Sequence, residues 1–273
     1  MGAKESSNQR RAGSLMAGLD VIEVLGGEPG GLSLTELAKR TGVDKGNLHR
    51  MLKSLIDRGY VARDEQTKLY SLTPAIVAVA GNLIRNMDVV NLARPLMREL
   101  METSEETVHL AYRTNTGGVY LAQERQANRV TVETEIGARP IIHCTATGKA
   151  LYCMAEDDEL EQVIDHEFTR YTDRTVTSME EFKTHLGLVV DRGWAEDNQE
   201  FTSGVRCVAA PVFDIHDRVV ASIGISGPAD RMASGRAEQV GALVRETCKQ
   251  LTISLGGSPS FFDRAEQTHP VFA

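Results

Sequence analysis

Cysteine and aromatic residues are scarce in this chain of 273 residues, which has four Cys and a single Trp. The cysteines include no Cys-x-x-Cys pair and no spacing typical of a disulfide framework, so we expect reduced thiols. No apolar run approaches the roughly 20 residues that cross a bilayer. The polar start, Met1–Arg11, lacks the apolar core of a secretion signal. We therefore expect a cytoplasmic protein without a membrane partner.

Catalytic motifs are missing as well. The sequence contains no Gly-x-Ser-x-Gly elbow, no glycine loop of the phosphate-binding type and no His-Glu-x-x-His. Lys149 or Cys207 as a nucleophile would lack an evident base. His143, Cys144 and Cys207 could meet around zinc, but their spacing is not typical of a zinc site. We expect no enzymatic activity, no metal and no cofactor.

What the sequence does contain is an ordinary globular composition with an uneven charge. Hydrophobic residues make up 41% and charged residues 25%, and the length allows two domains. Residues 1–80 hold 11 Lys and Arg against 9 Asp and Glu, a net charge of +2, so the total of −8 leaves −10 for the remainder. Only the N-terminal part is electrostatically suited to DNA, and its small charge favours an oligomer that adds several footprints.

Residues 33–72 follow the pattern of a winged helix-turn-helix. Ser33 and Glu36 have the spacing of a capping box at the start of a first amphipathic helix. Gly42 supplies a turn, and Asp44 is placed to cap a second helix. Strands ending near residues 61 and 72 would form the wing. The main known use of this motif is binding duplex DNA.

The second helix of the motif would present a polar face. Four apolar side chains recur at helical spacing and should face the core, whereas the outward set is Lys45, Gly46, Asn47, His49, Arg50, Lys53 and Ser54. Asn can bond adenine edges, and Arg or Lys can bond guanine edges or phosphates. The alternative is a merely solvated face, but the motif around it favours DNA. In the acidic wing turn, Arg63 and Lys68 are the plausible phosphate contacts.

The remaining sequence predicts an α+β protein. Residues 14–26 read as a helix with Leu15, Leu19, Ile22 and Leu25 inward, and a long helical pattern over 89–102 is interrupted at Pro95. Strands are expected at 108–112, 118–123, 130–133, 207–213 and 219–226, and helices at 157–167, 179–192 and 231–255. The expected domains are a disordered leader (1–12), the winged helix-turn-helix (13–73), a linker helix (74–88), a sensor domain (89–256) and a flexible tail (257–273).

Several segments resemble those of a known family. The run His143–Ala150, then Asp197, Gly204–Val212 and Ile225–Pro228 follow the N-terminal motif in an order and spacing that resemble the IclR family of bacterial one-component transcription regulators. The resemblance extends over about residues 14–256. It implies a GAF-like effector domain with an antiparallel sheet flanked by helices. It also implies a homodimer or homotetramer and a pocket for a small organic molecule, often a carboxylate, that alters operator DNA binding or RNA polymerase recruitment.

Carried over position by position, the resemblance also implies site residues. Backbone amides of the loop at Thr145, Ala146 and Thr147 would hold the effector carboxylate, and the rest of the pocket would be lined by Asp197, Cys207 and Ser226. This chain has Gly224 where a family member that binds small oxo-acids has a hydroxyl residue. We expect that difference to leave room for a larger or aromatic acid. On the DNA side, the family places Lys45, Asn47 and Arg50 at the reading positions and Ser33 near a phosphate.

The residues themselves leave some alternatives open. The amides before the helix at 149–154 could hold an anion, but a loop with a capping Thr fits the same pattern. Cys207 could equally be a small buried hydrophobe. Two functions follow. We expect an acid-responsive transcription regulator, a repressor in preference to an activator; the alternative is a cysteine-based redox sensor or small-molecule-processing enzyme with secondary DNA binding.

Overall fold

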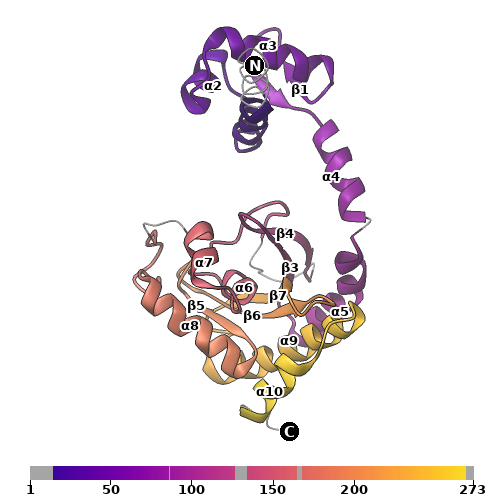
Figure 1. Ribbon diagram of the computed structural model, residues 1–273, viewed down its shortest axis with the longest axis vertical. Helices are drawn as coiled ribbons and strands as arrows, with labels where there is room; N and C mark the ends of the chain where they lie inside the picture. Colours follow the sequence, from indigo (N-terminus) through magenta and orange to yellow (C-terminus); the bar gives the residue numbers. More distant parts are fainter. Residues whose placement is uncertain (1–14, 86, 127–133, 165–167, 269–273) are drawn as a thin grey trace, which may run out of the picture. The chain divides into compact units, whose positions relative to one another are not determined.

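The protein consists of two compact units, residues 1–84 and 85–273. A computed structural model, drawn in Figure 1, describes residues 15–85, 87–126, 134–164 and 168–268. The predicted leader at 1–12 and the predicted strand at 130–133 lie outside these residues. The boundary between the units falls within the helix that the sequence predicts as a linker. Among the helices described here, none is long and apolar enough to cross a membrane.

The first unit is the predicted winged helix-turn-helix. After a helix at residues 15–26, its elements are α2 (Leu34–Thr41), α3 (Lys45–Asp57), β1 (Val61–Arg63), β2 (Tyr70–Leu72) and α4 (Ala75–Arg85). Gly42 ends α2 with φ of 67°, a left-handed conformation that glycine adopts without steric cost. β1 and β2 pair antiparallel with Val61 opposite Leu72, which forms the wing.

The core of this unit corrects one sequence prediction. In the first helix, Val21 and Leu25 are the buried residues, whereas Leu15 and Leu19 are 66% and 47% exposed. At about 100° per residue, Leu19 lies roughly 120° around the helix from Leu25. The predicted buried face of this helix, which included Leu15 and Leu19, is therefore rotated relative to the observed buried face at Val21 and Leu25. The buried residues pack against Leu37, Leu48 and Leu52 of the two motif helices.

The second unit is built on a five-stranded antiparallel sheet. In chain order the strands are β3 (Thr107–Thr114), β4 (Gly117–Glu124), β5 (Ala195–Asn198), β6 (Val205–Phe213) and β7 (Val219–Pro228), and they lie side by side as β4-β3-β7-β6-β5. The helices are α5 (Asp88–Ser104), α6 (Ala146–Leu151), α7 (Asp157–Val163), α8 (Met179–Arg192), α9 (Ser234–Ser254) and α10 (Ser260–Thr268). This confirms the predicted α+β class with helices flanking an antiparallel sheet.

The helices cover the sheet on both faces. α5 and α9 contact each other and pack on one face, while α6 lies on the other and contacts all five strands (Figure 1). α8 packs against α6 and β5. The core on the α6 side includes Ala111, Tyr120, Leu151, Phe182 and Leu186. The opposite core is formed by buried residues of α5 and α9, among them Met97, Val244 and Leu251.

Three further predictions on this unit were wrong. α5 runs through Pro95 without a break, because apolar residues on both sides of it, including Ala93 and Met97, are fully buried. The expected flexible tail contains α10, in which Phe261 and Phe262 are 5% and 1% exposed. No strand was expected at the polar residues 195–198, which form the edge strand β5.

Candidate functional site

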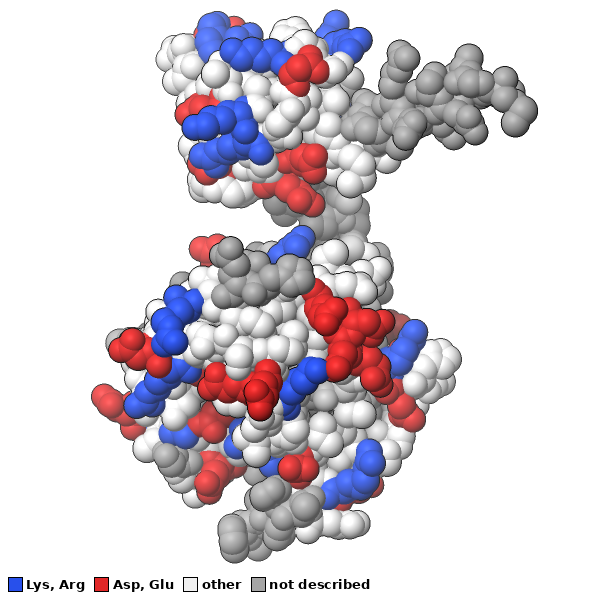
Figure 2. All heavy atoms as spheres, turned by 60° about the vertical axis from the view of Figure 1, so that its left-hand side comes forward, with Lys and Arg blue, Asp and Glu red and all other residues white. Residues whose placement is uncertain are grey.

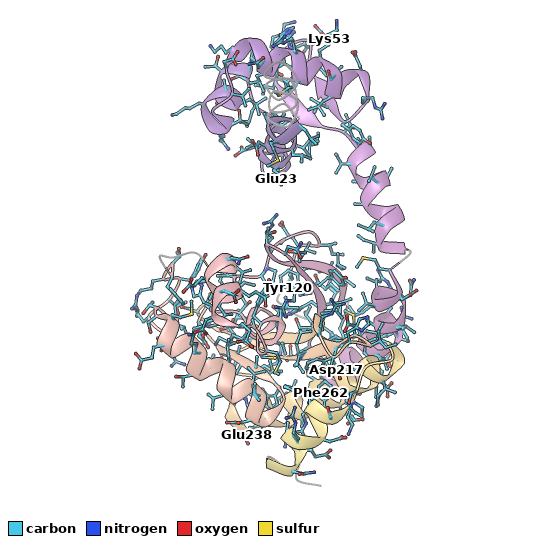
Figure 3. All side chains as sticks on the ribbon, in the orientation of Figure 1. Glu23, Lys53, Tyr120, Asp217, Glu238 and Phe262 are labelled. Carbon is cyan, nitrogen blue, oxygen red and sulfur yellow. The ribbon has the colours of Figure 1, made fainter. Side chains whose placement is uncertain are left out.

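The start of α3 is fixed by its capping residue. The Asp44 carboxylate accepts hydrogen bonds from the amides of Gly46 and Asn47 at 3.1 and 3.0 Å. Leu48 and Leu52 turn into the core. As a result Lys45, His49, Arg50 and Lys53 are exposed, and Lys53 is labelled in Figure 3. Figure 2 shows Lys and Arg side chains gathered on the surface of this unit, with Asp and Glu side chains between them.

Two of the predicted DNA-reading side chains contact each other. Asn47 is half-buried; its amide nitrogen donates to the Asp44 carboxylate, and its amide oxygen accepts from the Arg50 guanidinium. The hydrogen bonds from the Asn47 backbone amide and from its side chain hold the pKa of Asp44 below its usual value. The three side chains therefore form one network at the exposed start of α3. A base contact by Arg50 either uses this orientation or breaks its bond to Asn47.

Ser33 serves the helix that it precedes. Its hydroxyl accepts from the Glu36 amide at 3.3 Å and donates to the Glu36 carboxylate at 2.6 Å, while its own amide donates to that carboxylate at 3.0 Å. This is the predicted capping box. Because the hydroxyl is already engaged, a phosphate contact by Ser33 must compete with Glu36.

The second unit contains a cavity of about 390 Å³ beside the sheet. Six of the seven predicted effector residues line it, and these are Thr145, Ala146, Thr147, Asp197, Cys207 and Ser226. They come from the loop before α6, the start of α6 and the strands β5, β6 and β7. Segments up to 81 positions apart in the chain thus line one cavity, which the sequence alone could indicate only by resemblance.

The register of the sheet brings three of these residues into a row. Cys207 of β6 lies opposite Ser226 of β7 and, on its other side, opposite Asp197 of β5. Residues paired in this way point to the same face of a sheet. The Ser226 hydroxyl donates to the Cys207 sulfur at 3.0 Å. The row therefore gives the cavity a wall of polar side chains.

Asp197 carries the carboxyl group of that wall. It is 2% exposed, and its Oδ1 accepts from the amides of Glu200 and Phe201 at 2.7 and 3.4 Å. Burial raises the pKa of Asp197 to about 7; the negative charge of Glu200 also raises it, whereas the backbone hydrogen bonds and Lys149 lower it. Near neutral pH this carboxyl can therefore be either protonated or ionised.

The Lys149 ammonium, whose charge lowers the pKa of this carboxyl, is already engaged. The Lys149 Nζ donates to both carboxylate oxygens of Glu200 at 2.6 Å, to the Glu196 carbonyl at 2.8 Å, and lies 2.9 Å from His185 Nδ1. Lys149 is 1% exposed. Burial raises the pKa of Glu200, and burial together with the Lys149 charge lowers the pKa of His185 to about 4. Lys149 is therefore a structural cation rather than a nucleophile.

The loop before α6 offers backbone donors to the cavity. Thr145 caps α6 by accepting from the Gly148 amide at 3.1 Å, and its hydroxyl donates to the Ile141 carbonyl at 2.8 Å. Within the described segments, the amides of Ala146 and Thr147 have no hydrogen-bond acceptor. The Thr147 hydroxyl lies 2.7 Å from the hydroxyl of Tyr120, which projects from β4 (Figure 3). The arrangement can accept an anionic or carbonyl oxygen.

Gly224, the seventh predicted residue, does not line the cavity. A Cβ atom at this position would lie 2.8 Å from the Thr147 methyl group and 3.0 Å from His109 Nε2. The space that we expected to be available for a larger ligand is thus filled by these two side chains. Gly224 instead allows Thr147 and His109 to approach the sheet closely.

Sequence reasoning missed several cavity residues. His109 is 3% exposed and, with Tyr120, Arg139 and Phe201, lines the cavity. Burial lowers the pKa of His109 to about 4, so the ring is neutral at physiological pH. Its position on β3, directly opposite Gly224, was the signal that could have identified it, but that pairing is visible only in the folded sheet.

Cys207 does not have the properties of a reactive thiol. Burial raises the pKa of Cys207 well above its ordinary value, and the charge of Asp197 raises it further. Thiolate is the reactive form, so the neutral thiol is a poor nucleophile. In the part of the chain described here, no group of three or more His, Cys, Asp or Glu residues could hold a metal ion.

Comparison with known proteins agrees with this arrangement. Residues 14–65 match the model of the IclR helix-turn-helix domain, and residues 81–253 match the C-terminal domain of IclR bacterial transcriptional regulators. The regulator KdgR of Escherichia coli is 31% identical over 89% of this chain and 92% of its own length. The transcriptional repressor IclR of the same organism is 28% identical over 89% of this chain and 90% of its own length.

A solved structure shares the fold. The IclR transcriptional regulator from Alicyclobacillus acidocaldarius matches 89% of this chain and 98% of its own, with a TM-score of 0.78 and 21% identity. That identity supports the fold alone. The helix-turn-helix model contains the exposed residues Lys45, His49, Arg50 and Lys53, which we call the α3 surface. The C-terminal model contains the cavity strands β5, β6 and β7. The chain belongs to the IclR family of bacterial transcriptional regulators.

Proposed function

We propose that this protein is a transcriptional repressor whose operator binding changes when a small organic acid occupies the cavity of the second unit. The observation that carries the proposal is the convergence of six positions from four segments on one buried cavity, in a chain that also has a winged helix-turn-helix. Relatives named as repressors support the sign of regulation. We infer a homodimer or homotetramer, because a net charge of +2 in the first 80 residues is small for a single DNA footprint.

The cavity favours an acid with an apolar body. Free amides at Ala146 and Thr147 suit a carboxylate, while Ile141, Val205 and Phe201 supply apolar and aromatic surface. An aromatic or similarly sized acid fits a volume of about 390 Å³. We do not assign an enzymatic role, because Lys149 is bound to Glu200 and the Cys207 thiol is neutral. The same properties of Cys207 argue against the redox-sensor alternative.

The DNA-binding part of the proposal is tested by Arg50→Ala. An operator duplex is first selected from a random pool with the wild-type protein, and fluorescence anisotropy then compares it with a scrambled duplex. If Arg50 contacts a base edge, its loss should cost about 1–3 kcal/mol on the selected duplex and little on the scrambled one.

Arg58→Ala is the matched control. It removes the same charge from the exposed end of the same helix, and it should weaken both duplexes alike. Circular dichroism establishes that both variants are folded. An Arg50→Ala protein that still prefers the selected duplex by the wild-type factor would exclude Arg50 from base recognition.

A further inference from the structure

His109 has a hydrogen-bonding group that the protein leaves unused. Its Nδ1 and the Oγ1 of Thr107 are the buried side-chain atoms without a hydrogen-bond partner among the residues that the structure describes. The two residues are two positions apart on β3 and therefore face the same side of the sheet. A buried polar atom without a partner costs free energy, and such atoms require an explanation.

The ring is held firmly on the cavity wall. Gly224 lies directly opposite His109 in the sheet, close to Nε2. The Tyr120 ring packs edge-on at a centroid distance of 5.4 Å. On the remaining side, Nε2 lies 3.4 Å from the Ser226 hydroxyl, which already donates to Cys207. These neighbours fix the ring without satisfying Nδ1.

The protonation state restricts what such a ring can bind. Burial keeps His109 neutral at physiological pH, so the ring offers one N–H donor and one lone pair rather than a positive charge. Ser226, Cys207 and Asp197 continue the polar wall beside it. A carboxylate placed there would gain no cation and would approach the Asp197 carboxyl. A neutral hydroxyl group can donate or accept and therefore suits either tautomer of the ring.

We propose that His109 is a specificity-determining residue whose unpartnered ring nitrogen bonds a hydroxyl group of the effector. The cavity then selects a hydroxylated acid over the same acid without the hydroxyl. This inference rests on the proposed function of the cavity as an acid-binding site and names the second group that the acid carries. The carboxylate occupies the amides of Ala146 and Thr147, and the hydroxyl lies at His109.

The first test needs no ligand. His109→Phe keeps a planar ring and removes both nitrogens, the unpartnered Nδ1 and Nε2 with its long 3.4 Å bond to the Ser226 hydroxyl, so the gain and the loss offset and the melting temperature of the purified full chain should change little. Tyr120→Phe is the matched control: it removes a hydroxyl from the same cavity that does have a partner, Thr147, and the melting temperature should fall. A histidine retained only for structure predicts a fall in His109→Phe. His109→Leu gives a second readout if Phe does not fit.

The second test uses matched acids. Isothermal titration compares benzoate with its 2-, 3- and 4-hydroxy derivatives, and propionate with 2-hydroxypropionate, on wild type, His109→Phe and His109→Gln. In the wild type, at least one hydroxy acid should bind about tenfold more tightly than its parent acid. In His109→Phe that ratio should fall to about one, and His109→Gln, which keeps a polar group, should restore part of it.

The outcomes separate the two proposals. If the acids bind but none is preferred for its hydroxyl, or if the preference survives in His109→Phe, the role of His109 is overturned and the acid site stands. If none of the six acids binds the wild-type protein, the acid-binding function is overturned together with the inference that rests on it.

Discussion

The charge of one buried ammonium group, that of Lys149, acts on two buried carboxyl groups in the second unit, Glu200 and Asp197. Glu200 holds Lys149 with both of its oxygens, whereas Asp197 is held only by backbone amides. Placing a second negative charge next to that pair in a low-dielectric site is unfavourable. The pKa values of both carboxyl groups, Asp197 and Glu200, are therefore raised. An acidic ligand in the cavity would add a further negative charge near Asp197, which lines the cavity.

Asp197→Asn should change how stability depends on pH. The pKa of Asp197 is raised in the folded protein to about 7 from an ordinary value of 3.8, so between these values the folded state binds a proton that the unfolded state does not. Wild-type stability should then fall as pH rises from 4 to 7, by about 1.4 kcal/mol per pH unit from this group, and level off above 7. Urea unfolding of the variant at intervals of one pH unit should show this slope removed.

Asp191→Asn is the control for that measurement, because it removes a carboxylate from the exposed surface of α8. Its stability curve should run parallel to that of the wild type. Glu200, whose pKa burial also raises, contributes the same slope to the wild type and to Asp191→Asn. If Asp197→Asn gives a curve parallel to the wild type as well, Asp197 is ionised in the folded protein throughout this range.

At the scale of whole elements, α10 shows how a short helix can complete a core. Phe261 and Phe262 both contact Phe213 at the end of β6, at centroid distances of 5.0 and 5.8 Å. Lys249 of α9 holds Asp263 of α10 at 2.7 Å. The helix thereby packs against α8 and α9 and covers the end of β6 at Phe213.

Phe262→Ala should destabilise the second unit strongly. The side chain is 1% exposed, and truncating a buried Phe costs about 3–5 kcal/mol through lost transfer free energy and the cavity left behind. Gln267→Ala, at an exposed position of the same helix, should change the free energy of unfolding by less than about 0.5 kcal/mol. Denaturant unfolding followed by circular dichroism measures both. Equal stability of the two variants would mean that α10 contributes little to the core.

These elements mark where sequence reasoning succeeded and where it could not. Ser33 and Asp44 were identified correctly because a helix cap depends on residues within a few positions. β5 was missed because its four residues are mostly polar, and its pairing with β6 comes from residues eight to fourteen positions away. α10 was missed because Gly, Ser and Pro precede it, and its buried face is defined by contacts with Phe213 of β6 and with α8 and α9. His109 was missed for the same reason: the pairing that exposes it to the cavity is not local.

The molecule as a whole carries its two expected activities on separate units. The α3 surface belongs to residues 1–84 and the cavity to residues 85–273. Each unit has its own hydrophobic core. The formal charge is divided as well, at +2 for residues 1–80 and −10 for the rest of a chain with a total of −8. Communication between an acid and DNA must therefore pass from one unit to the other.

Coupling should consequently exist only in the intact chain. If the acid favours one arrangement of the protein, it changes the operator Kd by some factor, and bound operator must change the acid's Kd by the same factor. Typical couplings correspond to about 5- to 150-fold. Anisotropy with the selected operator, with and without a saturating acid, and titration of that acid with and without operator measure the two factors.

Residues 1–84 and 85–273, produced separately and mixed, provide the control. Because each unit has its own core, each should keep its own ligand, while the operator Kd should no longer respond to the acid. Should the mixture respond as the intact chain does, the signal passes through contacts between the units and not through the chain that joins them. An intact chain whose operator Kd ignores a tightly bound acid would show that the cavity does not regulate DNA binding, since a ligand that binds both arrangements equally shifts neither.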